Sequence, residues 1–365
     1  MLEGCNRSSE PTLKNTGPTV VGIGASAGGL SALQTFLEHV PPDSGLTYVV
    51  VVHLSPDHES HMAEVLQPHG RIPVTQVSHS VPLEPNHVYV IPPNANLSAI
   101  DTHLRVTKLE ERRQERVPID HFLRTLATAH DGNAIAVILS GTGSDGTLGI
   151  KEVKASGGLV IVQDPNEAEY DGMPQSVIAI GLADFILPVG QIPETILRFD
   201  RTKPQVPLPK DGDEVPQTEA AVLQKVFSQL RARTARDFSR YKRSTVLRRI
   251  ARRMQLNYIE DLGKYLERLR ERPDEVRALA DDLLITVTQF FRDPDCFERL
   301  EKQEIPRILA SKGPEDAIRV WSVGCATGEE AYSLAILLKE AAERSESPPK
   351  IQRSGQRNRC RETTP

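Results

Sequence analysis

Between Thr19 and about Asp200 the chain alternates between short runs of β-branched residues and longer segments whose apolar residues recur at helical spacing. This alternation predicts an α/β fold, a doubly wound and mostly parallel sheet with helices on both faces. The predicted strands are Thr19–Ile23, Thr47–His53, His87–Ile91, Ala134–Ser140, Gly158–Gln163 and Phe185–Leu187. The predicted helices are Gly28–His39, Glu59–Leu66, Ile119–His130, Gly146–Ala155, Pro174–Ile180 and Gln191–Phe199. An alternating run over Leu97–Leu109 predicts one antiparallel hairpin.

The pattern changes after Asp200. Arg201 to Gln217 is rich in proline and charge without a periodic apolar face, which predicts a linker. Amphipathic helical segments without a strand follow as far as Leu309, so we expect an all-α domain there.

A strand is predicted again at Ile318–Val323, followed by a glycine turn and an apolar helix from Ala331 to Ala341. This opens an α/β unit resembling a Rossmann fold, but the chain turns polar from Arg353 onward. We expect truncation, with a frameshift after Ile351-Gln352 as its explanation. The expected parts are a disordered extension (1–18), the α/β domain (19–200), the linker (201–217), the all-α domain (218–309), a truncated α/β domain (310–352) and a disordered aberrant tail (353–365).

Composition places few further limits on function. The 365 residues carry a net charge of −5, and 39% hydrophobic with 25% charged residues is ordinary for a soluble globular protein. We find neither a membrane-spanning run nor a secretory signal, so a cytoplasmic location is expected. The four cysteines lack paired spacing, which indicates free thiols.

The apolar run from Val20 ends in a small-residue turn, Gly22 to Leu30, that leads into a helix. Such a turn either cradles a phosphate or presents a nucleophilic side chain, here Ser26. A dinucleotide site needs an acidic residue at the end of the second strand, but His53 stands there. No Gly-Lys-Ser/Thr follows the turn, so a P-loop is excluded as well.

The serine alternative is favoured by the ends of three strands. Ser26 follows the first strand, His53 ends the second, and Asp145 follows the strand that begins at Ala134. Because parallel strands end at one edge of a sheet, we expect these side chains to meet as a catalytic triad. The helix N-terminus near Ala27 and Gly28, with Thr142 on the facing loop, would supply oxyanion donors.

Two alternatives concern neighbouring residues. Asp57, His58 and His61 lie close to His53 in sequence and could bind a metal, but a helix cap and exposed histidines explain them better, so we expect no metal. The segment Asp171 to Pro174, which includes Met173, and Asp164-Pro165 are either simple turns or the rim of the active site.

These residues resemble the chemotaxis protein-glutamate methylesterases, the CheB catalytic domain. The resemblance covers about Val20 to Phe199. Its motifs are Gly24-Ala25-Ser26-x-Gly28-Gly29, His53 with Leu-Ser-Pro, Tyr89-Val90-Ile91-Pro92-Pro93, Ser140 to Gly146 and Gly172-Met173-Pro174. It implies hydrolysis of glutamate methyl esters, and deamidation of some glutamines, on chemoreceptor signalling helices, without a cofactor. Thr142 replaces the family's usual Met, and the receiver domain often fused ahead of this esterase is missing, so control by an attached receiver is not expected.

The second half resembles the chemotaxis receptor methyltransferases (CheR) through Thr286 to Asp293 and Val320 to Glu330. The resemblance implies S-adenosylmethionine binding, with Thr288, Arg292 and Glu329 matching cofactor contacts, whereas Thr286 stands where the family often has Asn. It also implies receptor docking by a basic helix. The arginines at the docking positions are Arg248, Arg249, Arg252 and Arg253. Later parts of that family are absent from this sequence, so methyl transfer is not expected.

The sequence therefore predicts a methylesterase acting through Ser26, His53 and Asp145, with methyl-accepting chemoreceptors as partners. The alternative is a receptor-tethering module that uses the arginine-rich helix. A nucleotide-dependent enzyme is disfavoured by His53. Membrane insertion is not expected, and neither is a nucleic acid partner, because the net charge is negative and the basic run lacks interleaved aromatic residues.

Overall fold

The computed structural model describes residues 19–53, 60–108, 117–130, 132–202, 217–285, 290–292, 294–313, 316–323, 325, 328–344 and 349–356. The chain forms two compact units, residues 1–285 and 286–365. The first unit contains a sheet domain (residues 19–202) and a helical domain (residues 217–285). This division differs from the expected boundary near residue 310, because the helices after residue 293 pack in the second unit.

The sheet domain is built on seven parallel strands in the order β10-β9-β8-β1-β2-β5-β3. β1 lies in the middle, between β2 and β8, so the strand order reverses there and the carboxyl ends of all three strands meet at one edge. The predicted parallel sheet is confirmed. Its strands are β1 (Val20–Ala25), β2 (Thr47–Val52), β3 (Val74–Gln76), β5 (His87–Val90), β8 (Ala134–Ile138), β9 (Leu159–Gln163) and β10 (Phe185–Leu187).

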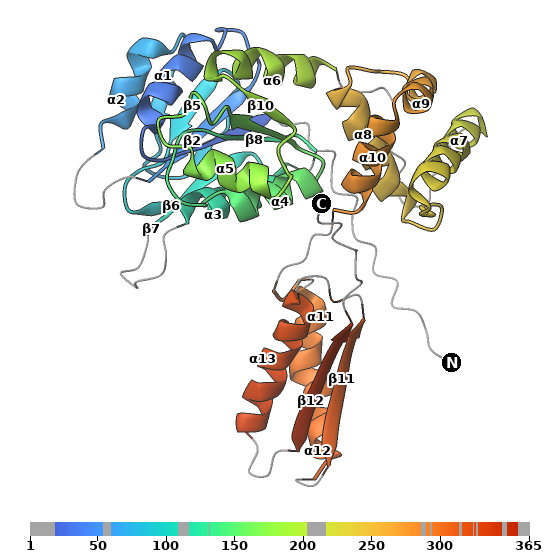
Figure 1. The fold of residues 1–365 in the computed structure, drawn as a ribbon. Helices are drawn as coiled ribbons and strands as arrows, with labels where there is room; N and C mark the ends of the chain where they lie inside the picture. The colour runs from blue at the N-terminus through green and yellow to red at the C-terminus, as the bar shows by residue number, and fades with distance from the viewer. Residues whose placement is uncertain are drawn as a thin grey trace. The chain divides into compact units, whose positions relative to one another are not determined.

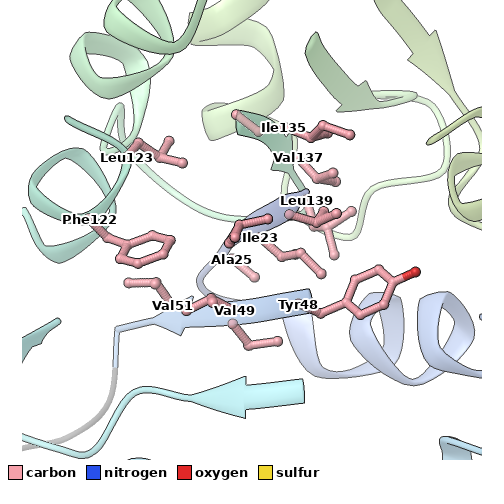
Figure 2. Packing of buried hydrophobic residues seen from close by; sticks show 14 of the residues in the cluster. Ile23, Ala25, Tyr48, Val49, Val51, Phe122, Leu123, Ile135, Val137 and Leu139 are labelled. Carbon is pink, nitrogen blue, oxygen red and sulfur yellow. The ribbon is translucent and has the colours of Figure 1, made fainter. Parts of the chain in front are cut away.

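Helices cover both faces of this sheet, with α1 and α6 on one side and α3, α4 and α5 on the other (Figure 1). The strands β1, β2, β8 and β9 are buried along their whole length, which explains their continuous apolar sequences. Figure 2 shows side chains of β1, β2, β8 and α3 packed together in this core. The helices are α1 (Gly29–Glu38), α2 (Met62–Leu66), α3 (Pro118–Ala129), α4 (Thr147–Ala155), α5 (Gly172–Ala179) and α6 (Ile192–Arg201), with short 3-10 turns η1 (Gln67–His69) and η2 (Val189–Gln191).

A second, antiparallel sheet contains the predicted hairpin. Its strands are β4 (Val81–Pro82), β6 (Ala95–Ile100) and β7 (His103–Lys108), in the order β4-β7-β6. The short strands β3 and β4 were not predicted.

The helical domain has its own apolar core, which includes Val226, Ile250 and Tyr265. The described residues of this domain contain no strand, so the prediction of an all-α domain after the α/β domain is confirmed. Its helices are α7 (Gln217–Thr234), α8 (Arg243–Leu256), α9 (Leu262–Glu271) and α10 (Pro273–Leu283).

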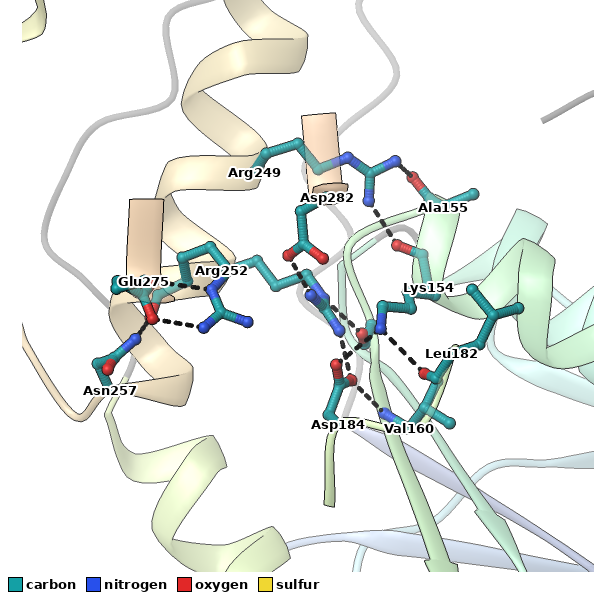
Figure 3. Close-up of polar contacts among 12 residues, drawn as sticks. Lys154, Ala155, Val160, Leu182, Asp184, Arg249, Arg252, Asn257, Glu275 and Asp282 are labelled. Carbon is teal, nitrogen blue, oxygen red and sulfur yellow. Dashed lines mark hydrogen bonds and ion pairs between the residues drawn. The ribbon is translucent and has the colours of Figure 1, made fainter. Parts of the chain in front are cut away.

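Helix α8 docks the helical domain onto the sheet domain through a buried ion cluster (Figure 3). The guanidinium of Arg252 lies between Asp184, directly before β10, and Asp282 of α10, and its Nε donates to the carbonyl of Gly158 at 2.9 Å. Lys154 is the second cation of the cluster, with its Nζ 3.1 Å from Asp184. Arg252 is 1% exposed, so both acids neutralise a charge that water does not reach.

Further contacts widen this junction. Both terminal nitrogens of Arg249 donate to the last carbonyls of α4, on Lys154 and Ala155. The guanidinium of Arg198 in α6 stacks over the ring of Tyr258, 3.6 Å from the ring centre. The helical domain therefore binds the edge of the sheet where β9 and β10 begin, opposite the edge where β1, β2 and β8 end.

The ion cluster makes the free energy of unfolding depend on pH in the acid range. Burial disfavours the ionised form of Asp184, but Arg252 and Lys154 outweigh that effect and hold the pKa of Asp184 below its ordinary value. A lowered pKa in the folded state gives stability that is complete above the unfolded pKa of about 4 and is lost as pH falls through the folded pKa. We expect the difference in unfolding free energy between the wild type and Asp184→Asn to be constant above that pH and to shrink below it.

Urea unfolding of both proteins along a pH series measures this difference. Asp43→Asn, at an exposed position, is the control and should follow the wild type throughout. A difference between wild type and Asp184→Asn that grows on acidification would contradict the stated role of the cluster.

The second unit contains two parallel strands, β11 (Ala317–Val323) and β12 (Lys350–Gln356), and the helices α11 (Pro294–Arg299), α12 (Ile305–Ala310) and α13 (Glu329–Glu343). A π-helical segment, η3 (Leu300–Glu304), connects α11 to α12. Ile305 packs with Ile318, Leu337 and Leu338, which assigns α12 to this unit. The expected disordered tail from residue 353 is wrong for its first residues, because Arg353 pairs with Val320 and the strand continues to Gln356. Within the described residues, no helix combines the length and apolar character needed to cross a bilayer.

Candidate active site

Ser26 and His53 meet at the carboxyl edge of the sheet. They directly follow Ala25 and Val52, which are register partners in β1 and β2, so the backbone places both residues at the same level. Nδ1 of His53 lies 3.0 Å from Oγ of Ser26. The imidazole is 32% exposed, so it can exchange protons with bound substrate and water.

Asp145 lies on the other side of the imidazole. Its Oδ2 is 2.9 Å from Nε2 of His53, and the carboxylate is 5% exposed. A proton on Nε2 would be donated to Asp145, which leaves the lone pair of Nδ1 directed at the Ser26 hydroxyl. The structure thus brings the three predicted triad residues together in the order serine, histidine, aspartate.

The turn after β1 is held by backbone contacts. The amide of Ser26 donates to the carbonyl of Ser140 at 3.0 Å, and the amide of Gly29 donates to the carbonyl of Ser26 at 2.9 Å. Gly28, at the N-cap of α1, has φ +68°, a left-handed conformation in which a Cβ atom is strained. This turn exposes Ala27 and leaves Ser26 half-buried at the surface of the sheet edge.

Ala27 and Thr142, the predicted oxyanion donors, are both exposed beside Ser26, but Met173 is not on the rim. Met173 is fully buried, and its amide donates to the carbonyl of Gly141 at 2.8 Å. It lies beneath Gly141, where a Cβ atom would come within 2.2 Å of the Met173 sulfur and 2.9 Å of Cβ of Ser26. The expectation that Met173 lies on the rim of the active site is wrong, because its side chain is buried and packs against Gly141.

The crowding at Gly141 gives a testable prediction. Gly141→Ala should lower kcat for the ester hydrolysis predicted from the sequence by roughly 10- to 100-fold, since displacing a reacting group by about 1 Å can cost ~100-fold. Steady-state kinetics on a methyl ester substrate measures this effect. Gly70→Ala is the control, because a Cβ atom there would meet no atom closer than 3.5 Å. Unchanged kcat in Gly141→Ala would refute the tight contact with Ser26.

Several residues that were not predicted from the sequence hold the site together. The buried hydroxyl of Ser140 donates to the carbonyl of Ala27 at 3.0 Å and accepts from the amide of Tyr170 at 3.0 Å. The amide of Ser140 donates to Oε1 of Gln163 at 2.7 Å. A polar Gln at the end of the apolar strand β9 is a sequence signal for such a contact. Together these bonds tie the loops after β1, β8 and β9 to one another.

Among the residues that the structure describes, no three His, Cys, Asp or Glu side chains lie close enough to hold an ion. His61 pairs with Glu64 at 3.0 Å on the surface. Asp57 and His58 lie outside the described residues. Asp164 and Asp171 stand at the two ends of the loop between β9 and α5, and the carbonyl of Tyr170 in this loop accepts a hydrogen bond from the amide of Gly141 at 2.9 Å.

The expected receptor-docking stripe is wrong for Arg249 and Arg252, which are 5% and 1% exposed and bind the sheet domain. Arg253 is mostly buried and pairs with Glu275 of α10 through two bonds of 2.8 and 2.6 Å. The side chain of Arg248 lies 3.4 Å from the position that a Cβ atom on Gly157 would occupy. Three of the four arginines of the stripe are thus engaged within the protein and Arg248 is half-buried, so the stripe no longer favours a tethering module.

The second unit contains the residues expected to contact S-adenosylmethionine. Arg292 and Glu329 come from segments that meet, because the amide of Phe291 donates to the hydroxyl of Ser333 in α13 at 2.9 Å. Gly328, at the N-cap of α13, has φ +109°, and Glu329 and Glu330 stand in the first turn. The carboxylates at this helix start could attract a cationic group. Of the three residues expected to contact the cofactor, the structure describes Arg292 and Glu329, and Thr288 lies outside the described residues.

Comparison with known families divides the chain into three parts. Residues 21–196 match the CheB methylesterase family. Residues 221–284 match the all-alpha domain of the CheR methyltransferase family, and residues 286–352 match its SAM binding domain.

Individual proteins are similar to parts of this chain. A putative protein-glutamate methylesterase/protein-glutamine glutaminase of Leptospira interrogans is 33% identical over 180 residues, which is 49% of this chain and 93% of that protein. An uncharacterized 104.1 kDa protein of Rhodobacter capsulatus is 38% identical over 303 residues, and this chain covers 32% of its length. The crystal structure of the Thermotoga maritima CheB methylesterase catalytic domain is similar to 50% of this chain and 98% of that chain, with 31% identity and a TM-score of 0.46. Because the Leptospira relative is matched over nearly its whole length, the chain belongs to the CheB methylesterase family, and its CheB part is followed by segments of the CheR methyltransferase family.

Proposed function

We propose that this chain hydrolyses the methyl esters of glutamate side chains, and deamidates glutamine side chains, on the signalling helices of methyl-accepting chemoreceptors. The observation that carries the proposal is the series of contacts from Ser26 through His53 to Asp145, with distances of 3.0 and 2.9 Å. A serine hydroxyl is a weak nucleophile at neutral pH, and an imidazole held by a carboxylate is the group that activates it.

In the proposed reaction, Oγ of Ser26 attacks the ester carbonyl while its proton passes to Nδ1 of His53. The tetrahedral intermediate collapses, the methoxide leaves with the proton held by His53, and an acyl-enzyme remains on Ser26. Water, deprotonated by the same imidazole, then hydrolyses the acyl-enzyme and releases the glutamate. The buried carboxylate of Asp145 stabilises the imidazolium that forms in both steps.

The oxyanion of the intermediate needs two donors. We assign these to the backbone amides of Ala27 and Thr142, which belong to exposed residues on facing loops beside Ser26. Neither donor requires a particular side chain, so Thr142 can serve where relatives have Met. No cofactor takes part in these steps.

For the second unit we propose that Arg292 and Glu329 would hold part of S-adenosylmethionine. The bound cofactor would supply an electrophilic methyl group. The carboxylate of Glu329, in the first turn of α13, would attract its positive charge.

Incubation with chemoreceptor fragments that carry methylated glutamates tests the esterase proposal. Methanol should be released, and rapid quenching followed by mass spectrometry should find the acyl group on Ser26. Methanol release with an acyl group on a different residue, or no release from any methylated fragment, would overturn the proposal.

A further inference from the structure

The carboxylate of Asp145 is held mainly by the start of another helix. It accepts hydrogen bonds from the amides of Ile119 at 3.0 Å and Asp120 at 2.9 Å, in the first turn of α3, and from the amide of Gly146 at 2.8 Å. Helix α3 begins with Pro118, which has no N–H, so these are the first two amides that the helix offers. The position of the carboxylate beside His53 therefore depends on where α3 begins.

A second carboxylate, on α3, binds the start of α4. The side chain of Asp120 accepts a hydrogen bond of 2.6 Å from the amide of Gly149, in the first turn of α4. Asp145 itself stands directly before Gly146, the N-cap of α4. In neither helix does the side chain of the N-cap residue cap the first turn. Instead, Asp145, just before α4, binds the start of α3, and Asp120 of α3 binds the start of α4.

The packing between these helices leaves little freedom. A Cβ atom on Gly149 would lie 2.6 Å from Cβ of Leu123 and 3.0 Å from the carbonyl oxygen of Asp120, so the two backbones are in direct contact. Asp120 is 5% exposed, and water has no ready access to the amide of Gly149 if the carboxylate is removed.

The second carboxylate carries an electrostatic cost. Burial raises the pKa of Asp120, the charge of Asp145 raises it further, and the amide of Gly149 and the charge of Arg124 only partly offset these effects. A neutral acceptor such as Asn could bind the Gly149 amide without placing a second negative charge beside Asp145.

We propose that Asp120 is a positioning residue of the esterase site: by binding α4 it fixes the first turn of α3, which in turn fixes the carboxylate of Asp145 against His53. This inference rests on the proposed function. It predicts that Asp120 affects turnover without affecting substrate binding, because it touches neither Ser26 nor the exposed rim.

Kinetics of Asp120→Ala and Asp120→Asn test the proposal. Asp120→Ala should lower kcat about 10- to 100-fold with KM unchanged within about 2-fold, as expected when a reacting group is displaced by a fraction of an ångström. Asp120→Asn keeps an acceptor for the Gly149 amide and should restore most of kcat. Glu194→Gln is the matched control, because Glu194 is an exposed acid in the first turn of α6.

A nuclear magnetic resonance measurement separates this proposal from the proposed function. In full-length protein with labelled histidine, the Nε2 proton bound to Asp145 should give a downfield signal in the wild type and in Asp120→Asn. The same signal should be lost or displaced in Asp120→Ala. A wild type without esterase activity that still shows this pattern overturns the proposed function only. Unchanged kcat and an unchanged signal in Asp120→Ala, or equal losses in Ala and Asn, overturn the role of Asp120.

Discussion

Replacement of Ser26 by Ala is expected to lower methanol release from methylated receptor by about 10⁴- to 10⁶-fold, the range seen when the nucleophile of a triad is removed. In the proposed mechanism His53 and Asp145 activate the Ser26 hydroxyl for the first attack on the ester, so the expected loss is large. Without that hydroxyl no acyl-enzyme forms, and activation of water by the imidazole is the remaining route. A coupled assay for methanol, sensitive enough to measure the residual rate, determines this ratio.

The substitution is small and Ser26 is half-buried, so the fold should remain intact. Ser228→Ala is the matched control, because Ser228 is an exposed serine of α7 whose hydroxyl bonds only within its helix, to the carbonyl of Gln224. Circular dichroism of both variants should match the wild type. Turnover by Ser26→Ala within tenfold of the wild type would mean that another residue is the nucleophile.

Replacement of Arg252 by Met is expected to lower the unfolding free energy of residues 1–285 by about 3–5 kcal/mol, the usual effect of breaking a buried ion pair from one side. The methionine fills much of the same volume, but it leaves Asp184 and Asp282 buried without their shared cation and the carbonyl of Gly158 without its donor. Lys154 still contacts Asp184, so the unpaired carboxylate of Asp282 should account for most of the lost unfolding free energy.

Urea unfolding followed by far-ultraviolet circular dichroism measures this effect. Arg243→Met is the control, because Arg243 is exposed at the start of the same helix and should change stability little. Arg252→Lys should also be destabilising, since an ammonium cannot bind two carboxylates and a carbonyl with the geometry of a guanidinium. Equal stability of Arg252→Met and Arg243→Met would show that the buried cluster contributes nothing to the junction.

Much of the sheet domain could be predicted from the chain because its signals are local. Buried parallel strands such as β1 and β8 are continuous apolar runs, and the helices between them keep one apolar face. Short or polar strands lack this signal: β3 has three residues, and β12 contains Lys350, Arg353 and two glutamines. Their pairing depends on a neighbouring strand, which a local pattern does not contain.

The candidate site likewise contains residues that local sequence predicts and residues that it does not. Ser26 and His53 follow the ends of strands, so topology alone brings them together. The burial of Arg249 and Arg252 could not be predicted, because a run of arginines normally indicates a solvated face and their partners lie far away in sequence. Asp184, for example, is 68 residues from Arg252. The role of Asp120 could not be predicted for a related reason. A lone acid in the first turn of a helix is common, and only its contact with Gly149, 29 residues away, distinguishes it.

The docking of α8 at the edge where β9 and β10 begin determines what a break in the chain between the two domains would do. The sheet and helical domains are joined by a buried cation shared between two acids, by backbone carbonyls and by a stacked ring, in addition to the peptide chain. A protease that cut the chain once between residues 202 and 217 would therefore leave a nicked complex in which the two fragments stay associated. Covalent continuity is not what keeps these domains together.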